Sequence, residues 1–339
     1  MEYNYDNLAQ QKEQLKKVLK KILSDSNADN RNNMSGKNKI DLVLAYTDSE
    51  LNNTSIPFFI RNPNEIEKLK WDEYCSCTLA KYLIEKKGKI AIVAKPCDSR
   101  ALVMYMVENQ ITKDNVYIIG MECGGMRTAN GLLSPGCIEC KIHIPPLFDV
   151  LIKQSGEVLA WEDYMKDNKL SDKLSDKLMS ADVESEINTQ NKAFEGEEQK
   201  NLSLERFKNE LDKCILCFSC RQACYGCYCP SCFVESTMPS WLPADPGRCA
   251  KMMYHLGRAM HLAGRCIECG ACERVCPSGV KIRYLIKEIT NFCENVYGYK
   301  AGIDPAESPV LVKYDKDDRE IGFLEGEDNE MHKSAGGTN

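Results

Sequence analysis

Eight cysteines in the C-terminal half of the chain fall into two runs with the same spacing. The spacing C-x2-C-x2-C-x3-C is the bacterial ferredoxin pattern, in which thiolates hold [4Fe–4S] clusters and the fourth cysteine of each run ligates the other cluster. A zinc ribbon is the alternative, but it uses paired C-x2-C knuckles and not four consecutive thiolates. We therefore predict two clusters, one held by Cys214, Cys217, Cys220 and Cys276 and the other by Cys224, Cys266, Cys269 and Cys272, with Pro277 closing the second run.

A second group of cysteines follows the first run. Three thiols on one loop, C-x-C-x2-C, could hold a further cluster or a structural zinc ion together with a more distant cysteine. Alternatively, the loop packs against the first cluster, or one of its thiols replaces Cys224 as a ligand. The candidate ligands are Cys227, Cys229, Cys232 and Cys249.

A third set of four cysteines lies in the N-terminal half, where each member occurs in a loop next to proline or glycine. Cysteines that are merely buried prefer strands and helices, so we expect these four to hold a third cluster. The set is Cys97, Cys123, Cys137 and Cys140. His143 could replace one thiolate, although a lone histidine is more often structural. Cys75, Cys77 and Cys293 are not expected to be ligands.

The elements that position the N-terminal set have an α/β pattern. Short runs rich in Val and Ile predict strands, and periodic apolar residues predict helices between them. The predicted strands are 40–46, 89–94 and 116–120, and the predicted helices are 78–87 and 99–109. In such sheets ligands collect beyond the carboxyl ends of the strands, where the loops with Cys97 and Cys123 fall.

The rest of the chain divides by composition. We expect an amphipathic docking helix at 7–24 and a polar loop up to residue 38, ahead of an α/β domain at 39–162. A polar linker at 163–206 precedes a mostly α, loop-rich dicluster ferredoxin-type domain at 207–300, with a helix at 250–262 between its two cysteine runs. An acidic tail is expected at 301–339.

Length and charge restrict the class of protein. A chain of 339 residues with 43% apolar residues is long enough for about two domains. The net charge of −6 argues against nucleic acid as a main partner. The sequence has neither a signal-peptide profile nor a membrane-spanning apolar run, so the 19 cysteines are expected in a reducing cytoplasm. Oxygen-sensitive clusters would suit an anaerobic or microaerobic cell.

The block 39–152 resembles the beta subunits of coenzyme F420-reducing hydrogenases and formate dehydrogenases. The resemblance rests on the ordered motifs IAIVAK, PCDSRAL, YIIGMECGGM, CIEC and PPLFDVLI. It implies that Cys97, Cys123, Cys137 and Cys140 ligate a [4Fe–4S] cluster. This chain has Asp98 where the family often has glutamine, and the family's flavin-binding half is not recognisable. The stretch GRCIECGACERVCP resembles iron–sulfur subunits associated with formate dehydrogenase and heterodisulfide reductase.

Three functions follow from these patterns. The first is an electron-transfer subunit of a cytoplasmic oxidoreductase such as a formate dehydrogenase, hydrogenase or heterodisulfide-reductase-type complex, possessing no catalytic side chain and exchanging electrons with partner subunits or ferredoxin. The second is a catalytic beta subunit that binds FAD through Lys95 and Arg100 at a helix N-terminus and exchanges hydride with a deazaflavin or nicotinamide. The third is an iron–sulfur or zinc regulatory protein. A sensor needs one labile site, so the number of cysteine sets argues against the third function.

Overall fold

The N-terminal half folds around a six-stranded mixed sheet. The structure is a computed structural model and describes residues 6–28, 39–51, 53–84, 86–167, 204–243 and 245–312. The strand order is β2-β1-β3-β4-β5-β6; β1, β3, β4 and β5 are parallel, while β2 and β6 pair antiparallel at the edges. The strands are β1 (Leu42–Asp48), β2 (Ser55–Ile60), β3 (Ile90–Ala94), β4 (Val116–Met121), β5 (Val150–Ile152) and β6 (Val158–Ala160).

The predicted crossover unit is confirmed in the middle of this sheet. All five residues of β3 are buried, as expected for a strand covered on both faces. The helix α2 (Pro96–Val107) follows at once and leads to β4. Pro96 occupies its first turn, where a missing N–H costs nothing, and the Asp98 carboxylate accepts the Lys95 backbone N–H at 3.3 Å. This start places Cys97 at the carboxyl edge of the sheet.

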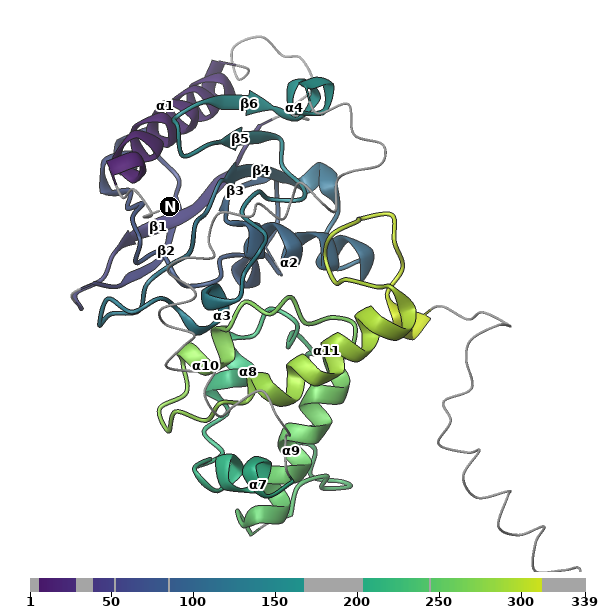
Figure 1. The fold of residues 1–339 in the computed structure, drawn as a ribbon. Helices are drawn as coiled ribbons and strands as arrows, with labels where there is room; N and C mark the ends of the chain where they lie inside the picture. The colour runs from purple at the N-terminus through teal and green to yellow at the C-terminus, as the bar shows by residue number, and fades with distance from the viewer. Residues whose placement is uncertain are drawn as a thin grey trace, which may run out of the picture.

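The N-terminal helix docks on its own domain. α1 (Asp6–Ala28) lies along the sheet near β5 and β6 (Figure 1). Its Gln11 is fully buried and donates to the carbonyl oxygen of Ile152 at 3.1 Å, while Trp71 Nε1 donates to the Gln11 side-chain oxygen at 3.0 Å. The predicted docking helix therefore packs against its own subunit.

The C-terminal half is helical and lies below the sheet domain in Figure 1. Short helices α3, α8 and α10 carry cysteines, and α9 and α11 are the long helices beside them. The helices after β4 are α3 (Pro135–Ile138), α4 (Trp161–Asp167), α7 (Leu204–Asp212), α8 (Ser219–Ala223), α9 (Arg248–His261), α10 (Ala271–Arg274) and α11 (Arg283–Tyr297). Single 3-10 turns occur at Pro63–Lys68, Ala80–Leu83, Lys113–Asn115, Phe233–Glu235 and Val310–Val312. The predicted fold class, α/β followed by a mostly α, loop-rich region, is confirmed.

Several predicted elements differ from the structure. The helix expected at 78–87 is only a 3-10 turn at Ala80–Leu83, and β2, β5, β6 and α11 were not predicted. Ala301 and Gly302, the first residues of the predicted tail, are buried. Most of the polar linker (168–203), most of the polar loop (29–38) and the tail from 313 onward lie outside the described residues. Within the described part of the chain, no helix combines the length and apolar character needed to cross a membrane.

Candidate iron–sulfur sites

The two ferredoxin-type runs adopt the same loop conformation. In both, the residue just before the second cysteine and the residue just after it have positive φ: Leu216 and Phe218 in the first run, Glu268 and Gly270 in the second. Only one of these four is glycine, so the backbone is strained at three positions, at a typical cost of about 1–3 kcal/mol each. This backbone conformation turns N–H groups toward the cysteine sulfurs: Leu216 N lies 3.3 Å from Cys214 Sγ, and Glu268 N lies 3.4 Å from Cys266 Sγ.

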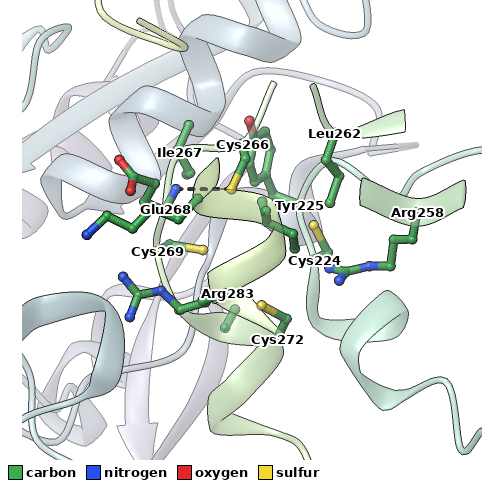
Figure 2. Close-up of a pocket in the computed structure, with 14 residues that line it drawn as sticks. Cys224, Tyr225, Arg258, Leu262, Cys266, Ile267, Glu268, Cys269, Cys272 and Arg283 are labelled. Carbon is green, nitrogen blue, oxygen red and sulfur yellow. Dashed lines mark hydrogen bonds between the residues drawn. The ribbon is translucent and has the colours of Figure 1, made fainter. Parts of the chain in front are cut away.

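The cysteines of the two runs meet in the crossed arrangement expected from the spacing. They surround two small hollows, and each hollow is lined by three cysteines of one run and the fourth cysteine of the other. We define the outer set as Cys214, Cys217, Cys220 and Cys276, and the inner set as Cys224, Cys266, Cys269 and Cys272. Figure 2 shows the four inner cysteines around one hollow. Cys272 also lines the outer hollow, so the two hollows are adjacent.

The donors around both hollows fit [4Fe–4S] clusters. A cubane fills the space between its four thiolates, and N–H donors to its sulfurs help to set its potential. Among the described residues, no three His, Cys, Asp or Glu side chains are grouped so as to hold a single metal ion. Buried side-chain nitrogens without a hydrogen-bond partner occur, within the described residues, on His143, His255 and Arg258, each next to a cysteine set.

The inner thiols differ in their readiness to ionise. Burial raises the pKa of Cys266 and Cys269, and that of Cys272 to about 12. Cys224 behaves in the opposite way: a hydrogen bond from Cys227 and, after it, the nearby Arg258 lower its pKa despite burial. Since the thiolate is the metal ligand, the other three thiols must lose their protons when iron binds.

A third set of cysteines gathers at the carboxyl edge of the sheet. Cys97 lies in the first turn of α2, Cys123 follows β4, Cys137 lies in α3, and Cys140 follows α3. Cys137 and Cys140 act electrostatically on Cys123, and Cys123 acts on Cys97. Amides again face sulfur, with Gly125 N 3.4 Å from Cys123 Sγ and Met126 N 3.4 Å from Cys137 Sγ. We call these four cysteines the sheet-edge set; their ligation of a cluster stays a prediction.

The sheet-edge set lies directly against the inner set. A side-chain carbon at Gly136 would lie 2.5 Å from the carbonyl oxygen of Cys269, and one at Gly270 would lie 2.5 Å from the Gly136 nitrogen. Glycine at both positions therefore lets the two cysteine-bearing loops touch. The Cys97 and Cys269 thiols are close enough for their charges to interact.

Lys95 and Arg100, the predicted flavin contacts, are both engaged inside the protein. Lys95 is buried, with Nζ 2.9 Å from the Asp98 carboxylate and a further hydrogen bond to Tyr46. Arg100 donates from Nε to the Ala301 carbonyl at 3.0 Å and from Nη1 to the Ile267 carbonyl at 3.0 Å. These contacts disfavour a phosphate-binding role and give Arg100 the task of joining the two halves of the chain.

The remaining candidate cysteines are more scattered. Cys227 lies beside Cys224, but Cys229 and Cys249 are exposed, and Cys232 lies near Arg221. A separate metal site on these four cysteines stays a prediction. His143 donates from Nδ1 to the Cys123 carbonyl oxygen at 2.8 Å. Cys75, Cys77 and Cys293 are placed outside all three sets, Cys75 and Cys293 being buried and Cys77 partly buried.

Sequence reasoning missed the side chains that α9 presents to the two hollows. Tyr254 Oη lies 3.1 Å from Cys220 Sγ, His255 Nε2 lies 3.3 Å from Cys214 Sγ, and Arg258 lines the inner hollow. The helix itself was predicted between the cysteine runs. Its buried face carries a tyrosine, a histidine and an arginine at helical spacing, and such polar residues on a core face were the available signal.

Comparisons with known proteins agree with this arrangement. A family model described as a 4Fe-4S binding domain matches residues 262–281. The F420-dependent formate dehydrogenase subunit beta of Methanocaldococcus jannaschii is 28% identical over 81% of this chain and 90% of its own length. The F420-dependent formate dehydrogenase 1 subunit beta of Methanococcus maripaludis is 24% identical over 81% of this chain and 89% of its own length.

The similarity confirms the resemblance predicted from the N-terminal motifs and extends it well past residue 152. It also agrees with the predicted role as an iron–sulfur subunit of an oxidoreductase complex. The chain is thus an iron–sulfur protein that carries a 4Fe–4S binding domain and is similar, along most of its length, to the beta subunits of F420-dependent formate dehydrogenases.

Proposed function

We propose that this chain is an electron-transfer subunit of an F420-linked formate dehydrogenase, with three [4Fe–4S] clusters in the order sheet-edge, inner, outer. One observation carries the proposal: the contact between Gly136 and Gly270, which brings the sheet-edge set against the inner set. The inner and outer hollows are themselves adjacent through Cys272. The three sites therefore form an unbroken path from the sheet domain to the outer end of the helical half.

The chain's own side chains would hold and tune the clusters and not carry out acid–base chemistry. The clusters supply one-electron transfer when bound. The thiols hold the iron, backbone amides at Leu216, Glu268 and Gly125 face the sulfurs, and burial of the inner set excludes water. Free thiols fit a reducing compartment, so we place the complex in the cytoplasm. Its partner would be a formate-oxidising subunit.

A flavin-containing catalytic subunit is the second candidate, favoured by the relatives named F420-dependent. Hydride exchange with a deazaflavin is two-electron chemistry, and a flavin is the cofactor that links it to single-electron carriers. The internal hydrogen bonds of Lys95 and Arg100 mean that any flavin would have to use other residues.

Quantifying iron, inorganic sulfide and acid-released flavin in anaerobically purified protein tests both candidates. Three cubanes correspond to about twelve iron atoms per chain, and two to about eight. About twelve with matching sulfide and no flavin is the expected result. About eight iron atoms per chain would contradict a cluster at the sheet edge. Stoichiometric flavin would favour the second candidate, and zinc without inorganic sulfide would overturn both candidates.

A further inference from the structure

Arg258 is a buried cation whose side chain is only partly hydrogen-bonded within the protein. It lies on the inward face of α9 with 3% of its surface exposed. Its Nη2 donates to the Cys220 carbonyl oxygen at 3.2 Å, while Nε and Nη1 have no hydrogen-bond partner. A buried polar group without a partner is destabilising, and a buried charge more so, so these two nitrogens call for an acceptor.

The surroundings of Arg258 identify that acceptor as anionic sulfur. The side chain lines the inner hollow, beside Cys224 in Figure 2. The neighbours that most strongly favour its charge are thiols, in the order Cys224, Cys272, Cys227 and Cys220. Two of these belong to the inner set and one to the outer set. A cluster held by four thiolates carries net negative charge, which would compensate the guanidinium and accept its free N–H groups.

The outer set has a different environment on the same helix. Tyr254 lies 3.1 Å from Cys220 Sγ and His255 lies 3.3 Å from Cys214 Sγ, and both line the outer hollow. Arg258 and Arg283 line the inner hollow, whereas no lysine or arginine of the described residues lines the outer one. The fixed positive charge of the lining is therefore on the inner hollow.

Resting on the proposed electron-transfer function, we propose that Arg258 raises the reduction potential of the inner cluster above that of the outer cluster. Positive charge and N–H donation favour the reduced, more negative form of a cluster. Reduction is the uptake of one electron from a one-electron donor, and no bond forms or breaks in the protein. Arg258 would thereby favour the electron on the inner cluster over the outer one.

Redox titration of the full chain with dithionite and mediators, followed by electron paramagnetic resonance, tests the proposal. In Arg258→Met, the ratio of reduced to oxidised inner cluster at a fixed potential should fall about tenfold, a shift of about 59 mV for one electron. In Arg258→Lys, which keeps the charge, the ratio of reduced to oxidised inner cluster should fall less than threefold. The inner signal is identified by its loss in Cys269→Ala.

The control is Arg248→Met on the same helix, because Arg248 is exposed and pairs with Asp212 at the surface. It should leave both signals in place. If Arg258→Met binds less iron, Arg258→Gln, which keeps N–H donors without charge, should show a fall that is larger than in Arg258→Lys and smaller than tenfold. An inner signal that does not shift in the neutral variant overturns the role of Arg258, whereas wild-type protein without cluster signals overturns the proposed function.

Discussion

Single side chains distinguish cysteines that the spacing treats as equal. Cys224 lines the inner hollow and Cys227 does not, although they are only three residues apart. Cys227 instead donates its S–H toward Cys224 and helps to lower the pKa of that thiol. Of the alternatives left open by the sequence, the geometry therefore supports Cys224 as ligand and Cys227 as its neighbour.

Cys224→Ser and Cys227→Ser form a matched pair that tests this assignment. Cys224→Ser should lose one ferredoxin-type signal and about four irons per chain, because its cubane lacks a ligand. Cys227→Ser should keep the wild-type iron content, since its hydroxyl can still donate to the Cys224 thiolate. Iron analysis and electron paramagnetic resonance give the answer, and the reverse pattern would contradict the assignment.

The sheet-edge set has its own test at Cys97. Cys97→Ala should lower the iron content by about four per chain and leave both ferredoxin-type signals intact, given four irons per cubane. Cys75→Ala is the control, because Cys75 is a buried thiol of the same domain outside the set. Equal iron contents in the two variants would refute a cluster at the sheet edge.

The aspartate that departs from the family pattern has a structural role. Asp98 is fully buried, accepts the Leu79 backbone N–H at 2.6 Å and pairs with Lys95 at 2.9 Å. A carboxylate at this position needs a cation, and Lys95 supplies it. The departure in the PCD motif is therefore compensated locally, next to Cys97.

At the scale of elements, the two halves are joined through α2 and the segment after α11. Arg100 donates three hydrogen bonds to the backbone carbonyls of Ile267 and Ala301. Gly302, with φ of +73°, has no room for a side chain because the Arg100 backbone lies against it. This contact holds the start of the second cysteine run against the sheet domain.

Arg100→Ala should loosen that junction. Hydrogen bonds to charged groups contribute about 1.5–3 kcal/mol each, so losing three of them should cost about 4.5 kcal/mol or more. We expect hydrogen exchange at residues 299–302 to accelerate about 1000-fold or more, as 1.4 kcal/mol corresponds to a factor of ten. Arg61→Ala, at an exposed position on the far edge of the sheet, is the control and should leave exchange there unchanged.

At the scale of the whole molecule, the part of the chain that the structure describes has two hydrophobic cores. The larger surrounds the sheet and also takes in Tyr225, Ile267 and Tyr299 from the helical half. The smaller contains Phe207, Leu211 and neighbours around the outer set, and several of its members are cysteines. A core built partly from cluster ligands should depend on the metal for its stability.

Removal of iron should therefore affect the halves unequally. In apoprotein prepared with a chelator under reducing conditions, amides of β1, β3 and β4 should stay protected from hydrogen exchange, since their core is apolar. Amides of α8, α10 and the loops between them should exchange faster, because four thiols without metal do not hold a strained loop. Uniform loss of protection in both halves would contradict this prediction.

Elements with a local signal could be predicted from the amino-acid sequence. Identical cysteine spacing predicted both runs and their crossed sets, and Val- and Ile-rich runs predicted β1, β3 and β4. The edge strands β2 and β6 gave no such signal, since they are partly exposed, and Pro57 in β2 is tolerated only at an edge. The apolar residues around Ala80–Leu83 led to the prediction of a helix. In the structure they belong to a 3-10 turn that is buried against α2 and β3.

The positions of the three cysteine sets relative to one another, and the cations that lie beside them, depend on the tertiary structure. Gly136 and Gly270 are far apart in sequence, and their contact depends on how α3 meets the second cysteine run. Arg100 and Arg258 carry the same charge, yet folding directs one to backbone carbonyls and the other to thiols. Ligand spacing is a property of one loop, whereas the path between clusters and the charge beside each of them arise from contacts between distant segments.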